Sequence, residues 1–255
     1  MLWQPSLPPR YTEMTDDQLA EAIAARKAEL GSDLVILGHH YQQDDVVRHA
    51  DFTGDSFKLS QLAAEKVREV GAKYVVFCGV HFMAESADIL TPDEVTVILP
   101  DLSAGCSMAD MAGYDDVVEA WEQIEEVLAD EGFRGRVIPI TYMNSSAAIK
   151  AFVGERGGAV CTSSNAAEVL AWALAGGTEP KADDEQIKIL FLPDQHLGRN
   201  TAAAMGYDIT TQMCLWDPQA PEGLGGLEPD DLLPSTMILW KGHCSVHKLF
   251  RPAHV

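Results

Sequence analysis

The stretch DLVILGHHYQ, residues 33–42, decides the fold class of this chain. Its apolar run is continuous rather than alternating, which is typical of a strand in a parallel sheet that is covered on both faces. Two histidines and a tyrosine, His39, His40 and Tyr41, follow the run directly. Ligands of open α/β sheets bind at the carboxyl ends of the strands. The stretch therefore predicts a buried parallel strand that ends in a binding site.

The same pattern recurs along the whole chain. Helix-like stretches separate several of the apolar runs; one begins at Thr15, a residue type that caps helices, and two end in Gly71 and Gly132. Polar residues follow each apolar run. This alternation predicts an α/β fold of repeated three-layer α/β/α domains with short parallel sheets. The further apolar runs are KYVVFCGV (73–80), VTVILP (95–100), RVIPITY (136–142), GAVCTS (158–163), KILFLP (188–193) and TMILW (236–240).

The order of the runs predicts the domain organisation. We expect an N-terminal arm over residues 1–13, a first α/β domain over 14–113 and a second over 114–255, with the long amphipathic stretch 114–132 after the boundary. Each half has strands followed by His- or Tyr-bearing loops, which indicates a duplicated unit. The Pro-, Gly- and acid-rich segment 216–235 is predicted to be a surface loop.

Composition excludes several classes of protein. The net charge of −21, from 39 acidic and 18 basic residues, argues against a nucleic-acid or anionic-membrane partner. The sequence has neither a signal-peptide pattern nor a run of about 18 apolar residues, so we expect a cytoplasmic location. Five scattered cysteines do not form the framework of a disulfide-rich domain. They are therefore thiols or metal ligands.

Two of these cysteines stand out by position. Cys106 and Cys244 each follow an apolar run through a short flexible turn, so both are candidate metal ligands, whereas Cys78, Cys161 and Cys214 are expected to pack in the interior. Two thiolates without a C-x-x-C pair do not make a standard structural zinc site.

Other polar stretches suggest acid–base chemistry and anion binding. The His39–His40–Tyr41 segment supplies titratable groups. The segments GDS (54–56), MNSS (143–146) and TSSN (162–165) offer hydroxyls and turn amides for a carboxylate or phosphate. Walker, dinucleotide and G-x-S-x-G motifs do not occur, which disfavours nucleotide and triad chemistry. Two alternatives stay open: a metal-dependent lyase or aldolase that uses His39 and His40, and a non-catalytic metal-binding or dimerisation module.

Eight stretches, taken together and in order, resemble the quinolinate synthase family. The resemblance implies an iron–sulfur transferase of pyridine nucleotide (NAD) biosynthesis that condenses iminoaspartate with dihydroxyacetone phosphate. It implies three pseudo-symmetric α/β domains, and a [4Fe–4S] cluster held by one cysteine from each, with one iron open to the substrate as a Lewis acid. L-Aspartate oxidase or aspartate dehydrogenase is the implied supplier of iminoaspartate. The stretches are GHHYQ, ADFTGDSFKLS, GVHFMAESADIL, PDLSAGCSMADM, YMNSSAAIKA, TSSNA, PDQHLGR and KGHCSVHKLF.

The resemblance also implies roles for single residues. Cys106 and Cys244 become cluster ligands, and we add that His243 and His247, which flank Cys244, tune the cluster. The residues implied to bind substrate, with His39, Tyr41 and Tyr142 also as candidate catalytic groups, are His39, Tyr41, Ser56, Tyr142, Asn144, Ser163 and Asn165.

The sequence departs from the family pattern in one respect. The family's third domain, with its His-Pro-Glu motif and third cluster cysteine, has no counterpart before Val255. We therefore expect two of the three domains here and the chain to be a piece of a longer enzyme. The 255 residues alone are expected to hold a labile cluster or none and to have negligible synthase activity.

Overall fold

The computed structural model describes residues 4–251 and 253. The chain divides into two compact units, Met1–Cys106 (unit 1) and Ser107–Val255 (unit 2). The predicted boundary after residue 113 lies further along the chain and stays a proposal. Within the predicted arm, residues 1–3 lie outside the described residues, and a short helix, α1 (Pro9–Thr12), interrupts the extended course that was expected.

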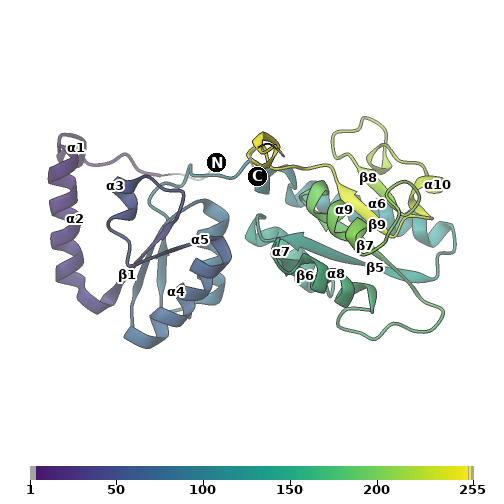
Figure 1. Ribbon diagram of the computed structural model, residues 1–255, viewed down its shortest axis with the longest axis horizontal. Coiled ribbons are helices and arrows are strands. Elements are labelled where there is room, and N and C mark those ends of the chain that lie inside the picture. The colour runs from purple at the N-terminus through teal and green to yellow at the C-terminus, as the bar shows by residue number, and fades with distance from the viewer. Residues whose placement is uncertain (1–3, 252, 254–255) are drawn as a thin grey trace. The chain divides into compact units, whose positions relative to one another are not determined.

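Unit 1, the part coloured purple to blue in Figure 1, contains a parallel sheet. The sheet has four strands in the order β2-β1-β3-β4. The decisive stretch forms β1, one of the two central strands, as predicted. The strands are β1 (Leu34–His39), β2 (Phe52–Gly54), β3 (Tyr74–Cys78) and β4 (Thr96–Ile98), and the α-helices after α1 are α2 (Asp16–Leu30), α3 (Asp44–Val47), α4 (Ser56–Val70) and α5 (His81–Leu90).

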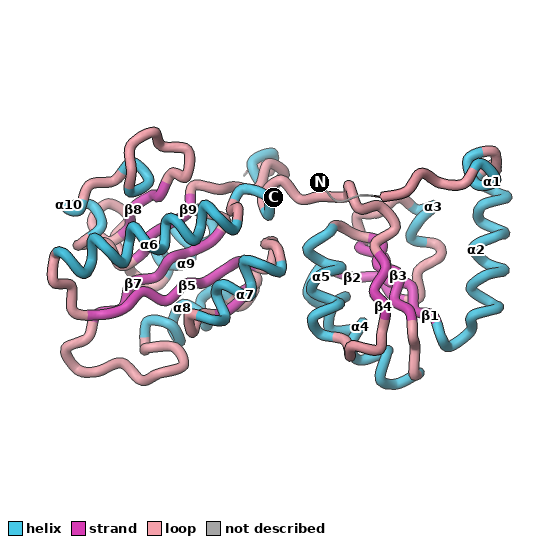
Figure 2. Tube along the Cα trace, turned by 180° about the vertical axis from the view of Figure 1, so that it is seen from behind, coloured by secondary structure: helices cyan, strands magenta, loops and turns pink. Residues whose placement is uncertain are grey.

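The helices of unit 1 follow from their caps and apolar faces. Thr15 caps α2 in a capping box with Gln18, and Gly71 ends α4 in the left-handed conformation, as the sequence predicts. α4 and α5 bury apolar faces on one side of the sheet, whereas α2 stands on the other side and buries none of its residues (Figure 2). The core of unit 1 therefore lies between the sheet and the α4–α5 pair.

Unit 2 contains a five-stranded parallel sheet with the strand order β6-β5-β7-β9-β8. Successive residues of β7 point to opposite faces: Leu190 packs beneath α6 and α7, and Phe191 packs beneath α8 and α9 (Figure 1). The predicted α/β fold with short parallel sheets is thus confirmed. The elements are α6 (Tyr114–Asp130), β5 (Gly135–Tyr142), α7 (Ala147–Glu155), β6 (Ala159–Cys161), α8 (Ala166–Leu174), β7 (Gln186–Leu192), α9 (Gln195–Ala204), β8 (Met213–Trp216), α10 (Pro229–Leu232) and β9 (Met237–Trp240).

The two sheets share one strand order. If β8 is set aside, β6-β5-β7-β9 repeats β2-β1-β3-β4, with the second strand of each unit at the edge and the first beside it. β8 is added at the far edge of the unit-2 sheet. This agreement supports the duplicated unit that the sequence indicates.

The prediction that segment 216–235 is a surface loop was wrong. Trp216 is the buried last residue of β8, and the segment continues into the short helix α10, whose Leu232 is fully buried in the core beneath α6. β2 and β8 were not predicted either. Across residues 4–251 and 253, no helix is both long enough and apolar enough to cross a lipid bilayer.

Lys188 fastens this segment to the sheet. Its side chain is buried on β7, and Nζ donates hydrogen bonds to the carbonyl oxygens of Leu232, Leu233 and Ser235 at 3.0, 2.7 and 2.6 Å. Burial lowers the pKa of Lys188 to about 8, so the ammonium form still predominates at neutral pH. The ammonium group thus satisfies carbonyls that water does not reach.

We expect Lys188→Met to lower the free energy of unfolding by about 2 kcal/mol, because the buried carbonyls lose their donor while the apolar stem keeps its packing. Urea denaturation of the variant and parent chains measures the difference. Lys181→Met, at an exposed position, is the control and should leave the midpoint unchanged. A midpoint for Lys188→Met equal to that of the parent would show that these hydrogen bonds contribute no net stability.

Candidate functional site

The candidate residues of unit 1 gather at the carboxyl end of β1. His39, the last residue of the strand, is buried, with 4% of its surface exposed, whereas Tyr41 is 53% exposed. The two rings stack with centroids 3.8 Å apart. Ser56, the first residue of α4, brings its Oγ to 3.4 Å from Nε2 of His39. The parallel neighbour β2 places Ser56 here, because Gly54 pairs with His39.

Backbone contacts fix the tautomer of His39. The backbone N–H of Tyr41 donates to Nδ1 of His39 at 3.4 Å, so Nδ1 carries no proton and Nε2 carries it. Burial, reinforced by His40 and opposed by Asp55, lowers the pKa of His39 to about 4. At neutral pH the ring is therefore an uncharged donor toward Ser56, which leaves the serine O–H group available for a ligand.

The low pKa of His39 makes the stability of unit 1 depend on pH. The unfolded chain binds a proton with a pKa near 6.5 and the folded chain only near 4, so stability is fully present above about pH 6.5. As the pH falls from 6.5 to 4 we expect a loss of up to about 3 kcal/mol. Urea denaturation at pH 7.0 and 4.5 measures this loss, and His39→Gln should flatten the pH dependence. An equal slope in both chains would contradict the assignment.

Cys106 lies beyond β4, within the electrostatic reach of Tyr41. Burial, and secondarily the charge of Cys106, raises the pKa of Tyr41, so the phenol keeps its proton at neutral pH. The loop before Cys106 is anchored because the backbone N–H of His81, at the start of α5, donates to the carbonyl oxygen of Ala104 at 2.8 Å. Unit 1 thus brings the predicted residues His39, Tyr41, Ser56 and Cys106 to one end of its sheet.

A cavity of about 450 Å³ opens at the corresponding end of the unit-2 sheet. Burial raises the pKa of Tyr142; a hydrogen bond with Ser163 opposes the rise, and the charges of Asp194, Cys161 and Cys244 add to it. Tyr142 is therefore a protonated donor beside a serine hydroxyl. The lining residues are Tyr142, Ser163, Asp194, His196, Leu197, Asn200, Cys244, His247 and Lys248.

The loop that carries Cys244 is held from several sides. The indole N–H of Trp240 donates to the carbonyl oxygen of Met111 at 2.7 Å, and the backbone N–H of His243 donates to Sδ of Met111 at 3.3 Å. The backbone N–H of His247 donates to Sγ of Cys244 at 3.4 Å. This contact gives Sγ of Cys244 a backbone donor and fixes the position of the sulfur at the cavity wall.

The two units present their cysteines by the same backbone contact. In unit 1, the first residue of α5 donates its N–H to Ala104, two residues before Cys106. In unit 2, Gln195, the first residue of α9, donates its N–H to the carbonyl oxygen of Gly242 at 3.1 Å, two residues before Cys244. The duplicated architecture therefore extends to the residues that carry the thiols.

The cysteines differ in their fitness as metal ligands. Burial raises the pKa of Cys78, of Cys161 to about 12 and of Cys214 to about 11, so these three stay protonated thiols. Cys106 and Cys244 are half-buried at strand ends, and no disulfide forms among the described cysteines. Thiolate sulfur is the donor that iron–sulfur clusters require. The two residues fit as cluster ligands by their chemistry, although the described part of the chain contains no group of three or more His, Cys, Asp or Glu side chains placed to hold a metal ion.

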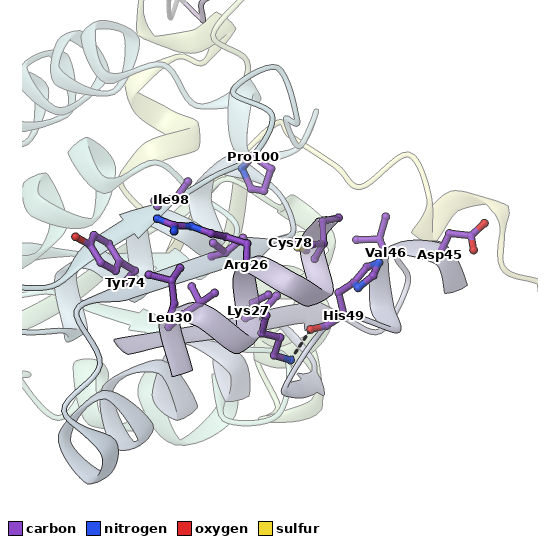
Figure 3. A pocket seen from close by; sticks show the side chains of 14 residues that line it. Arg26, Lys27, Leu30, Asp45, Val46, His49, Tyr74, Cys78, Ile98 and Pro100 are labelled. Atoms are coloured by element: carbon purple, nitrogen blue, oxygen red, sulfur yellow. Dashed lines mark hydrogen bonds between the residues drawn. The ribbon is translucent and has the colours of Figure 1, made fainter. Parts of the chain in front are cut away.

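A cavity of about 690 Å³ in unit 1 is not the candidate site (Figure 3). It lies between α2 and the face of the unit-1 sheet that is opposite α4 and α5. Its wall is mainly apolar, with Arg26 and Lys27 from α2 on one side and Tyr74 and Ile98 from the sheet on the other. None of the predicted site residues lines it.

The unit-2 cavity is lined by some of the predicted residues and by others that were not predicted. Asn144 lies two residues beyond Tyr142 and does not line the unit-2 cavity. Asn165 accepts hydrogen bonds from the backbone N–H and hydroxyl of Thr162, which is a turn-forming role. Four further polar lining residues were not predicted; the signal for three of them was the polar stretch PDQHLGRN after an apolar run, and Lys248 lies in the stretch KGHCSVHKLF. These residues are Asp194, His196, Asn200 and Lys248.

The geometry around His39 and His40 disfavours the lyase alternative. Nδ1 and Nε2 of His39 face the Tyr41 backbone and Ser56, and Nδ1 of His40 lies 3.0 Å from the carbonyl oxygen of Gly54. Three of the four ring nitrogens are thus engaged by the protein, which leaves His40 Nε2 as the one available ligand atom of the pair.

Comparisons with known proteins show the family of this chain. The family model described as quinolinate synthetase A protein matches residues 21–255. The chain is 56% identical over 246 residues to a quinolinate synthase of Acidobacterium capsulatum, covering 96% of this chain and 61% of the relative. It is 53% identical over 247 residues to that of Corynebacterium glutamicum, covering 97% and 58%. The chain thus spans about 60% of the length of these curated relatives. It belongs to the quinolinate synthetase A family.

Proposed function

We propose that the protein containing this chain is a quinolinate synthase, which condenses iminoaspartate with dihydroxyacetone phosphate in NAD biosynthesis. The observation that carries the proposal is the matched pair of half-buried cysteines. In each unit the thiol follows the fourth strand of the shared order and is anchored by the helix after the third. Membership of the family supports the reaction, and the donor-rich strand ends support small anionic substrates.

Cys106 and Cys244 are the proposed ligands of a [4Fe–4S] cluster. When bound, the cluster supplies a Lewis-acidic iron for the dehydration chemistry. The protein's own contribution at Cys244 is the N–H of His247, which stabilises negative charge on the sulfur. The position of this contact supports the proposal that the histidine segment after Cys244 tunes the cluster.

The remaining site residues are proposed to bind and orient the substrates. In unit 1, His39 holds Ser56 so that the serine hydroxyl donates to a carboxylate or phosphate oxygen. In unit 2, Tyr142 and Ser163 form a second pair of hydroxyl donors. Tyr41 and Tyr142 are the proposed proton donors, because both phenols stay protonated at neutral pH. Asn144 is proposed to contact substrate from beside the cavity rather than from its wall.

The setting of the reaction follows from its substrates. We place the enzyme in the cytoplasm, with L-aspartate oxidase or aspartate dehydrogenase supplying the unstable imine. The domain boundaries proposed for this chain remain residues 14–113 and 114–255, after an arm over 1–13.

The test is an assay of the full-length protein, purified without oxygen. Incubation with dihydroxyacetone phosphate and enzymatically generated iminoaspartate should yield quinolinate, detected by chromatography and mass, and omission of either substrate should abolish it. A cluster-loaded protein that forms no quinolinate from both substrates would refute the proposal. Bound zinc without acid-labile sulfide would favour the metal-dependent lyase instead.

A further inference from the structure

A histidine that sequence analysis left without a role lines the unit-2 cavity. His196 lies in the first turn of α9, half-buried, and shares the cavity wall with Tyr142, Ser163 and Cys244. Its backbone N–H donates to Oδ1 of Asp194 at 2.8 Å, and that carboxylate is itself only 3% exposed. The start of the helix thus has a defined geometry, and His196 is placed at the cavity by it.

The ring of His196 is held by an arginine. Nη2 of Arg199 lies 2.9 Å from Nδ1 of His196. A guanidinium group has only donors and keeps its charge in proteins, so Nδ1 must accept this hydrogen bond. The ring proton then resides on Nε2. Arg199 makes this bond without a competing ion pair, since no carboxylate of residues 4–251 and 253 lies within 4.0 Å of its nitrogens.

The surroundings keep the ring uncharged. Burial lowers the pKa of His196, and the positive charges of Arg199, Lys248 and His243 act in the same direction, while Asp194 opposes them. These charged and titratable groups come from α9 itself, from the turn before it and from the segment after β9. Because the His196 ring is neutral and its Nδ1 already accepts a hydrogen bond, the remaining polar group of the ring is the Nε2–H donor.

We propose that His196 is a substrate-contacting residue whose Nε2–H group donates a hydrogen bond to a phosphate or carboxylate oxygen in the unit-2 cavity, and that Arg199 is the positioning residue that fixes this tautomer. The cavity supports an anionic ligand, because Lys248 supplies positive charge and Tyr142, Ser163 and Asn200 supply further hydrogen-bonding groups. The arrangement parallels unit 1, where His39 has the same tautomer for a different reason. The substrate class rests on the proposed function; the tautomer does not.

The first measurement is ¹⁵N NMR of the histidine rings in the metal-free full-length protein at pH 7, with His196→Gln for assignment. We expect the Nε2–H tautomer in the parent, a mixture of tautomers in Arg199→Met, and recovery of the single tautomer in Arg199→Lys, which keeps a donor. An Nδ1–H tautomer in the parent, or an unchanged spectrum in Arg199→Met, would overturn the positioning role.

The second measurement adds ligands one at a time to the same sample. Dihydroxyacetone phosphate supplies the phosphate and succinate the carboxylates; a shift of the His196 Nε2 signal with the first alone assigns the phosphate, and with the second alone the carboxylate. A signal that moves with neither overturns the contact. This result does not depend on synthase activity, so it separates failure of the contact from failure of the proposed function.

In the active holoenzyme, His196→Ala should raise KM for the substrate identified by NMR about 10- to 100-fold, with a smaller change in kcat. His196→Gln, whose amide N–H₂ lies near the position of Nε2, should recover most of this loss. Unchanged KM values for both substrates in His196→Ala would overturn the proposal.

Discussion

Replacement of Cys244 by serine in the full-length protein is expected to abolish the oxygen-sensitive visible absorption of the proposed iron–sulfur cluster. Loss of residues that only support metal ligands typically costs about 10- to 100-fold in metal affinity or activity, so loss of a thiolate ligand itself should cost more. The hydroxyl of serine is a harder donor and stays protonated at neutral pH. Cys106→Ser should have the same effect, because the two units present their cysteines by the same backbone contact.

The matched control is Cys78→Ser. Cys78 ends β3, lines the apolar cavity beneath α2, and has a pKa raised by burial, so it is a protonated thiol that faces a different cavity. Absorption, iron and acid-labile sulfide should match the parent in this variant. Quantitative iron and sulfide analysis decides the matter: a Cys244→Ser protein with a full complement of both would remove Cys244 from the ligand set.

Much of the fold could be predicted because its strands are continuous apolar runs. β1, β5, β7 and β9 are nearly fully buried, so most of their positions are apolar, and the pattern is visible without structural knowledge. β2, a three-residue edge strand that is not fully buried, carries no such signal. The segment 216–235 misled for a related reason: its composition is typical of a loop, yet Leu232 and the carbonyls bound by Lys188 anchor it to the core.

The candidate site also has a part that the sequence predicts and a part that it does not. The ends of buried strands can be recognised in a sequence, and these ends indicated His39, Tyr142 and the two proposed cysteine ligands. The proposed role of His196 could not be predicted from the sequence, because it depends on one side-chain contact with Arg199. That contact determines which ring nitrogen of His196 carries the proton. Spacing shows that the two residues lie on one helix face, but not which ring nitrogen accepts.

The second large effect is expected from Gly242→Ala, because Gly242 is where two functional loops of unit 2 touch. A Cβ atom at this position would overlap the carbonyl oxygen of Pro193, at the end of β7. The glycine's own carbonyl accepts from Gln195, its N–H donates to Trp240 at 2.7 Å, and it forms a parallel bridge with Asp194. Because the carbonyl oxygen and carbon of Pro193 are backbone atoms, and a Cβ atom has a fixed position on its own backbone, no change of rotamer relieves the clash.

Relief of that overlap must separate the loop that carries Cys244 from the start of α9, which carries His196. We expect a loss of more than about 3 kcal/mol in the free energy of unfolding, together with loss of the cluster absorption. Gly154→Ala is the matched control: this glycine lies in α7 with nothing within 4 Å of the added Cβ, so the change should be neutral or stabilise by up to about 1 kcal/mol. Chemical denaturation and visible spectra of the two variants provide the comparison. Parent-like stability and absorption in Gly242→Ala would show that the two loops are not held in contact by this glycine, and that the cysteine is positioned by the Trp240 and Met111 contacts instead.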